Sequence, residues 1–207
     1  MNYVTLVSNI QSFMEDDGTE FVAAIPTIIT QAEEIIFQRL PNLPCFRSLS
    51  TGNLVQGTVD YTIANARMIR QVSITIANVN SYLDHRVDSY LRDYWPNSTT
   101  QATPEMYSTK NATTSGTIIT LAPTPDAAIA YQVDFIAPET GLSSGNANSW
   151  IGDNEDNLLL SACLYESSSF LKSPETLNLY KAQFDEAVQL FQQEMARVYT
   201  AEYNGGI

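Results

Sequence analysis

Few side chains in this sequence are of the types that metal binding or nucleophilic catalysis requires. There is one histidine, His85, and the two cysteines, Cys45 and Cys163, lie far apart and form no C-x-x-C motif. Metal sites of His and Cys need several ligands at short spacings, and that pattern is missing. Cys163 lies in an apolar run typical of a buried core thiol. We therefore expect two reduced thiols, a surface histidine and no bound metal.

Carboxylates are the remaining groups with catalytic potential. A cell-wall glycan hydrolase needs two carboxyl groups that face one cleft. The clustered candidates are Glu33, Glu34, Asp84 and Asp88. Adjacent residues of a helix do not face each other, so a solvated helix face explains Glu33 and Glu34 better. The hydrolase remains an alternative hypothesis, but we expect a protein that is not an enzyme and has no catalytic residue.

The sequence favours neither a calcium site nor a phosphate-binding site. The acidic run 153–157 lacks the glycine and the closing glutamate of an EF-hand, and helix capping accounts for it. Neither glycine-rich phosphate-binding motif is present, so we expect no cofactor. A ligand-binding module stays open as a second alternative, in which Tyr107, Tyr131 and Trp150 would form an aromatic floor.

Length and charge limit the remaining classes. With 207 residues and 44% hydrophobic residues, the chain can bury its own core. Its formal net charge of -13 has the wrong sign for gripping DNA through phosphate neutralisation. No apolar stretch approaches about 18 residues and no basic leader precedes an apolar segment, so we expect neither membrane insertion nor a standard secretion signal.

Apolar residues at helical spacing occur at both ends of the chain. Residues 1–40 read as two helices separated at Asp16-Asp17-Gly18, with Pro26 in the first turn of the second helix. Near the other end, Asp153 or Asn154 is expected to cap a helix that runs to Leu171. Ser173-Pro174 is expected to begin a last helix, with an apolar stripe as far as Met195 or Val198.

The middle of the chain changes to two-residue alternation, which predicts strands. The strongest patterns lie at 59–63, 72–76, 117–121 and 131–135. The last two flank a proline-rich turn and are expected to pair as an antiparallel hairpin. A short helix is expected over 82–95, followed by a mobile polar loop to Thr103.

These elements predict an α+β fold. A helical bundle core would be formed by N-terminal helices in 1–45 and C-terminal helices in 151–198. Residues 46–150 would form an inserted antiparallel β module with a short helix, and 199–207 a flexible C-terminal tail.

The element order and three stretches together resemble the head-to-tail adaptor (connector) proteins of tailed bacteriophages. The first stretch is 25–33, leading to Arg39-Leu40. The second is 119–127, with its Pro123-Thr124-Pro125-Asp126 turn, leading to Tyr131. The third runs from Trp150 through the leucines of 158–160 to Phe170-Leu171-Lys172-Ser173-Pro174-Glu175. The resemblance spans nearly the whole chain.

The resemblance implies a structural virion protein, made in the host cytoplasm and located at the head–tail junction. Its copies, twelve in such proteins, would form a ring between the portal protein and a tail nozzle or stopper protein. The helical part would meet the portal and the β part would face the tail. DNA would pass through the ring without specific binding, and an acidic wall suits that passage. We expect a monomer or weak oligomer that forms the ring only on its partner.

The resemblance also assigns a role to the C-terminal end, because some members insert a flexible tail between portal subunits. The sequence here ends in a polar, glycine-containing segment that helix propensity disfavours. We therefore expect portal docking by Tyr199, Tyr203, Gly205, Gly206 and Ile207.

Overall fold

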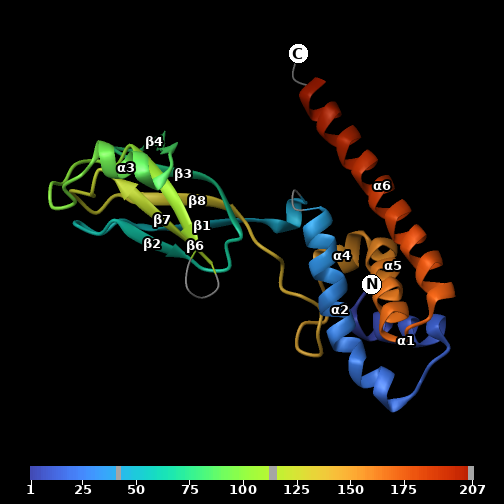
Figure 1. Ribbon diagram of the computed structural model, residues 1–207. Coiled ribbons are helices and arrows are strands. Elements are labelled where there is room, and N and C mark those ends of the chain that lie inside the picture. The colour runs from blue at the N-terminus through green and yellow to red at the C-terminus, as the bar shows by residue number, and fades with distance from the viewer. Residues whose placement is uncertain (41–42, 112–115, 205–207) are drawn as a thin grey trace. The chain divides into compact units, whose positions relative to one another are not determined.

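The chain divides into two compact units, which Figure 1 shows in ribbon form. The computed structural model describes residues 1–40, 43–111 and 116–204. The helical unit comprises Met1–Pro41 and Glu139–Ile207, and the β unit comprises Asn42–Pro138. The expected α+β fold, with a β-rich segment inserted between helices, is confirmed.

The helical unit is built around one buried helix. Its elements are α1 (Tyr3–Met14), α2 (Thr19–Arg39), α4 (Trp150–Asn154), α5 (Asp156–Phe170) and α6 (Pro174–Asn204). α5 packs against α1, α2, α4 and α6, and its apolar residues are buried on several sides. The core includes Leu6, Ile29, Ile36, Leu159, Cys163, Phe184 and Phe191.

The predicted break between the first two helices is confirmed, but the position expected for Pro26 is wrong. Asn2 caps α1 by accepting a hydrogen bond from the Thr5 N–H at 2.9 Å. α2 begins at Thr19, so Pro26 lies inside the helix instead of in its first turn. Pro26 is on the exposed face of α2, where water can bond the carbonyl group that proline leaves unpaired.

The C-terminal helices differ from expectation at two points. Ser149 is the cap that the sequence analysis missed: its hydroxyl accepts from the Gly152 N–H at 3.1 Å and begins α4, and α5 follows after Glu155. The predicted start of the last helix at Pro174 is confirmed. α6 then continues through Tyr199 and Tyr203 to Asn204, past the end expected near Val198.

The β unit contains two four-stranded sheets, ordered β1-β8-β3-β4 and β2-β7-β6-β5. Neighbouring strands are antiparallel except for β5 and β6, which are parallel. The elements are η1 (Pro44–Phe46), β1 (Arg47–Asn53), β2 (Asp60–Ile63), β3 (Met68–Ile76), β4 (Val79–Tyr82), β5 (Asp84–His85), α3 (Asp88–Tyr94), β6 (Met106–Asn111), β7 (Thr117–Ala122) and β8 (Ala130–Ile136).

Both sheets contribute to one hydrophobic core. Val72 and Val133 come from the first sheet, where they are register partners, and Ile119 and Leu121 come from the second. All four are nearly inaccessible to solvent. The β unit is therefore a sandwich whose core lies between the inner faces of the two sheets.

Two predictions for the β unit are wrong. The expected hairpin of 117–121 with 131–135 does not form, because β7 pairs with β2 and β6 while β8 lies between β1 and β3. The proline-rich segment carries the chain from one sheet to the other. The expected helix over 82–95 is helical only in α3. The Leu83 N–H bonds the Val72 carbonyl at 2.9 Å, so the first part of that segment joins the sandwich.

Residues 139–150, which the sequence analysis assigned to the insert, belong to the helical unit. Two carboxylates hold them there. Glu139 Oε2 accepts from the Trp150 N–H at 2.9 Å, and Glu33 Oε1 of α2 accepts from the Leu142 N–H at 2.8 Å. The boundary therefore lies at Pro138, next to the last strand.

Candidate functional site

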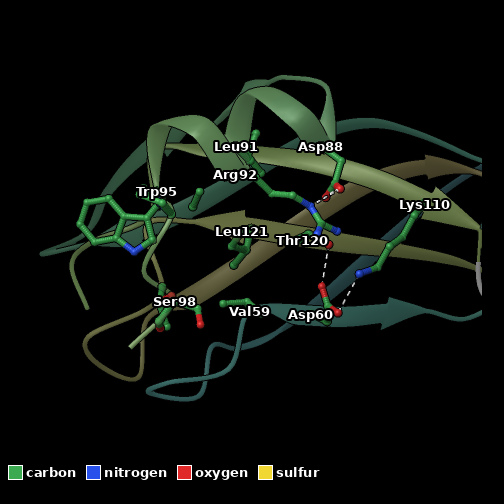
Figure 2. A pocket seen from close by; sticks show the side chains of 13 residues that line it. Val59, Asp60, Asp88, Leu91, Arg92, Trp95, Ser98, Lys110, Thr120 and Leu121 are labelled. Atoms are coloured by element: carbon green, nitrogen blue, oxygen red, sulfur yellow. Dashed lines mark hydrogen bonds and ion pairs between the residues drawn. The ribbon is translucent and has the colours of Figure 1, made fainter. Parts of the chain in front are cut away.

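The β unit has a cavity of about 330 Å³ on the outer side of its second sheet, beside α3. Figure 2 shows it from close by. Its lining comes from the start of β2, from α3 and the loop after it, and from β6 and β7. The lining residues are Val59, Asp60, Asp88, Leu91, Arg92, Trp95, Pro96, Ser98, Lys110, Thr120, Leu121, Ala122 and Thr124.

The apolar part of this pocket is set by α3 and the loop that follows it. Leu91 faces inward from α3 and is 4% exposed. Trp95 and Pro96 follow the helix, and the indole Nε1–H of Trp95 donates to the Thr100 carbonyl at 2.9 Å. The Thr124 hydroxyl donates to the Ser98 carbonyl at 2.9 Å. The loop expected to be mobile is therefore tied back to the sandwich and to Trp95.

The polar wall centres on Asp60. Its Oδ2 accepts from Lys110 Nζ at 2.8 Å and its Oδ1 accepts from the Thr120 hydroxyl at 2.6 Å. Burial acts to raise the pKa of Asp60, but the two hydrogen bonds and the charges of Lys110 and Arg92 outweigh it and hold the pKa below its usual value. Arg92 Nε in turn donates to Asp88 at 2.7 Å. The negative charges of the two carboxylates are balanced by the positive charges of Lys110 and Arg92.

This arrangement suits docking better than catalysis. Asp60 and Asp88 are each engaged by a cation, and neither is left as a general base. Apolar side chains form one side of the pocket and a neutralised polar wall forms the other. Such a pocket can receive an apolar side chain of a partner together with an adjacent polar group. Trp95 and Leu91 were missed as site residues; the Trp-Pro pair after an amphipathic segment was the available signal.

The four carboxylates considered for a hydrolase are divided between the two units. Glu33 and Glu34 lie on α2 in the helical unit, while Asp84 and Asp88 lie in the β unit. Asp84 is paired with Arg86 at 3.1 Å, and Glu34 accepts from a neighbouring glutamine of its own helix. Each carboxylate is therefore engaged by its own surroundings.

The aromatic floor considered for a ligand-binding module does not form either. Tyr107 is 3% exposed in the sandwich core, and its ring centroid lies 5.0 Å from that of His85. Tyr131 packs against Tyr61 at 5.7 Å. Trp150 belongs to the helical unit. Trp95, which was not considered, is the aromatic residue that lines the pocket of the β unit.

The cysteines and the histidine lie where the sequence analysis expected. Neither Cys45 nor Cys163 forms a disulfide, and burial raises the pKa of the Cys163 thiol far above its usual range. His85 is exposed on β5. Within residues 1–40, 43–111 and 116–204, no cluster of three His, Cys, Asp or Glu side chains is placed to hold a metal ion. No helix in that part of the chain is long and apolar enough to cross a membrane.

Glu33 has the most strongly perturbed carboxyl group of the helical unit. Burial raises its pKa to about 7 against the opposing hydrogen bond from Leu142, and the negative charge of Glu139 raises it further. A β-carbon at Gly141 would collide with the Glu33 carboxyl group, so the loop packs directly on it. Glu33 therefore holds the segment that returns from the β unit.

The far end of α6 is the second candidate for a binding element. Phe191 is the last residue of α6 among the buried hydrophobic residues, and Figure 1 shows the red half of the helix running on past α5. Residues 192–204 add about 20 Å of helix at about 1.5 Å per residue. Tyr199 and Tyr203 lie on this projecting part, while Gly205, Gly206 and Ile207 lie outside the described residues.

The negative charge of the protein is concentrated in one unit. By sequence, the helical unit carries 16 acidic and 4 basic side chains, a net charge of -12. The β unit carries 7 acidic and 6 basic side chains, a net charge of -1. Any partner of the helical unit therefore meets a strongly acidic surface.

The sequence profile of the SU10 adaptor protein family matches residues 1–205, and the chain belongs to this family. Membership indicates a structural, adaptor-type protein of a phage particle. No curated protein matches the chain by sequence.

Proposed function

We propose that this protein forms a ring at the neck of a tailed phage, between the portal protein and the tail nozzle or stopper protein. The observation that carries the proposal is the family match over residues 1–205, which covers both units. An adaptor has to bind different partners at its two ends, and the chain has two compact units of different charge and surface. The ring, of twelve copies, lines the channel through which DNA passes.

The helical unit is the portal side in this proposal. α6 projects beyond its packed part, and a projecting helix can enter a groove between neighbouring subunits. Tyr199, Tyr203, Gly205, Gly206 and Ile207 form the docking end. Repetition around the ring multiplies weak contacts through effective concentration.

The β unit is the tail side. Its pocket beside α3 offers an apolar floor and balanced charges, which suits contact with another folded protein. The acidic helical unit has a separate consequence, because a negatively charged wall repels DNA and lets it slide without adhesion.

Assembly on the portal is the direct test. Purified protein alone, at micromolar concentration, is expected to sediment as a monomer or weak oligomer. Mixed with portal, it is expected to form rings of twelve copies stacked on the portal in negative-stain images. A stable ring without portal would refute portal-dependent assembly, and absence of any complex with portal would refute the proposed function.

Truncation after Arg197 separates folding from docking. Between residues 174 and 197 of α6 the last buried residue is Phe191, so the truncated chain is expected to keep a folded circular dichroism spectrum and its unfolding midpoint. Binding to portal-containing heads is expected to fall by at least tenfold, as measured by co-sedimentation. A truncated protein that bound heads with unchanged affinity would move the docking role to another part of the helical unit.

A further inference from the structure

The helical unit contains a groove of about 350 Å³ between the end of α1, α5 and α6. Its bed is apolar: Leu164 is 3% and Ala187 7% exposed. Phe13 and Leu190 stand at its sides and are 56% and 57% exposed, although both are large hydrophobic residues. Burial of such side chains by a partner is worth about 25 cal/mol per Å² of apolar surface.

One carboxylate lines this groove, and others follow or precede its lining residues in the sequence. Glu186 lines it directly, and the α1 end that carries Phe13 continues into Glu15, Asp16 and Asp17. At the start of α5, next to the lining residue Asn157, burial and the nearby charges of Glu194 and Asp156 raise the pKa of Glu155. Like charges that crowd one another are relieved by a cationic partner.

The surrounding cations do not offset this charge. The helical unit has four basic side chains by sequence, and none of them lines the groove. Arg39 is already paired with Asp185 at 3.2 Å and lies over the Phe184 ring. An apolar bed lined by Glu186, in a unit with a net charge of -12, is complementary to a segment that carries apolar residues on one side and lysine or arginine on the other.

The groove walls also select the backbone form of the occupant. All three walls are helices, whose backbone groups are bonded within themselves. An extended peptide would find no strand edge to pair with and would leave its own backbone groups unsatisfied where it is buried. A helix satisfies its backbone internally and presents side chains at i, i+3, i+4 and i+7.

A second copy of this chain is a poor occupant. Each helical unit carries a net charge of -12, and by sequence residues 192–204 of α6 bring Glu194 and Glu202 with a single Arg197. Such a helix lacks the row of cations that the charge of this groove favours. We propose that the α1–α5–α6 groove binds a basic amphipathic helix of a partner protein, which is the portal protein if the proposed function holds.

The first experiment uses a defined probe, a fluorescent 20-residue Leu/Lys peptide with leucine at helical spacing, and a Leu/Glu peptide of the same pattern. The test variant is Phe13→Asp with Leu190→Asp. The matched control is Val4→Asp with Leu179→Asp, because Val4 and Leu179 are 69% and 54% exposed, lie on the same helices and do not line the groove. Both pairs add two negative charges, so charge alone would strengthen binding of the Leu/Lys peptide equally.

The control is expected to bind the Leu/Lys peptide at least as tightly as the wild type, and the groove variant is expected to bind it at least tenfold more weakly than the control. The Leu/Glu peptide is expected not to bind. Binding should weaken as sodium chloride rises from 50 to 400 mM. If the groove variant bound the Leu/Lys peptide as well as the control does, adventitious charge attraction would be the explanation and the groove proposal would be overturned.

The second experiment repeats the comparison with purified portal. Loss of portal binding in the groove variant, but not in the control, supports the groove as the portal contact. Equal portal binding by both overturns the portal as its occupant while leaving the proposed function intact. If the wild type itself fails to bind portal, the proposed function fails, and the peptide experiment still decides whether the groove takes a basic helix.

Discussion

The helical unit and the β unit have similar numbers of residues but differ in how far their charges are compensated. The β unit balances its charges almost completely and pairs Asp60 and Asp88 with Lys110 and Arg92. The helical unit leaves a net charge of -12 largely uncompensated and buries part of the Glu33 carboxyl group. A unit that only had to fold would not need such an excess. The uncompensated like charges repel one another, so the helical unit carries a cost in stability that the β unit lacks.

The two units are also expected to respond to pH in opposite directions. Glu33 has a raised pKa in the folded state, so the folded helical unit binds more protons than the unfolded one between about pH 4.5 and 7. Its stability should rise as pH falls through that range. Asp60 has a lowered pKa, so its contribution is present above about pH 4 and is lost as pH falls further.

Removing the buried aromatic ring of Phe184 is expected to change the free energy of unfolding most. Phe184 is 1% exposed, with the Tyr165 ring stacked at 6.3 Å, so Phe184→Ala should lower the free energy of unfolding of the helical unit by about 3 to 5 kcal/mol. The chain has two tryptophans, Trp95 in the β unit and Trp150 in the helical unit. Fluorescence in urea, recorded in Trp95→Phe and Trp150→Phe backgrounds, reports each unit separately.

The matched change in the β unit is Ile119→Ala, at a residue that is 0% exposed. It should shift the Trp95 transition by about 2 to 5 kcal/mol and leave the Trp150 transition in place. If either substitution moved both transitions by the same amount, the chain would unfold as one cooperative block, and the comparison of two separate units would be wrong.

An intermediate effect is expected from neutralising the buried carboxyl group. Glu33→Gln keeps an oxygen that can accept from the Leu142 N–H but cannot ionise. It should stabilise the helical unit by about 2 kcal/mol at pH 8 and flatten the rise in stability between pH 7 and 5. Urea unfolding followed at Trp150 across pH 5 to 8 measures both.

Glu34→Gln is the control for loss of one negative charge from the same helix. It should leave most of the pH dependence in place, because the Glu34 carboxylate accepts a hydrogen bond from Gln38 on the exposed face of its own helix. Equal flattening by both variants would assign the pH dependence to the overall charge of the helical unit and remove the special role of Glu33.

The smallest effect is expected in the β unit, from Asp60→Asn. The Asp60 and Lys110 side chains are 46% and 42% exposed, so solvent screens their ion pair and the loss should be at most about 1 kcal/mol at pH 7. Below about pH 4 the wild type should lose the same advantage, so the two Trp95 unfolding curves should converge. Asp84→Asn, at the exposed pair with Arg86, is the matched control. If Asp60→Asn lowered the free energy of unfolding by more than about 2 kcal/mol, the polar wall of the pocket would have a structural role beyond the Asp60–Lys110 ion pair.

Much of the helical unit could be predicted from sequence because its signals are local. The Asp16-Asp17-Gly18 break and the Ser173-Pro174 start are decided by nearby residues, and both are confirmed. Pro26 was misplaced because burial of Phe21 and Ile25 extends the helix before it. Tertiary packing decided that case, and a helix propensity rule could not.

The β unit was harder because strand partners lie far apart in the chain. The alternation at 117–121 and 131–135 located both strands, but their partners, β2 and β6 for one and β1 and β3 for the other, are set by the shared core. The pocket depends on the same pairing. Asp60, Lys110 and Thr120 are separated by tens of residues and meet only because β2, β7 and β6 are neighbours in one sheet. No spacing rule could have joined them.

In the proposed function the two units bind different partners. The acidic helical unit binds the portal, and the charge-balanced β unit binds the tail protein. A cryo-electron microscopy map of the portal–adaptor–tail complex tests this most directly. Helical density from α6 is expected against the portal, and the sandwich, with its pocket beside α3, is expected against the tail protein. A map with the sandwich on the portal and the helices toward the tail would contradict it.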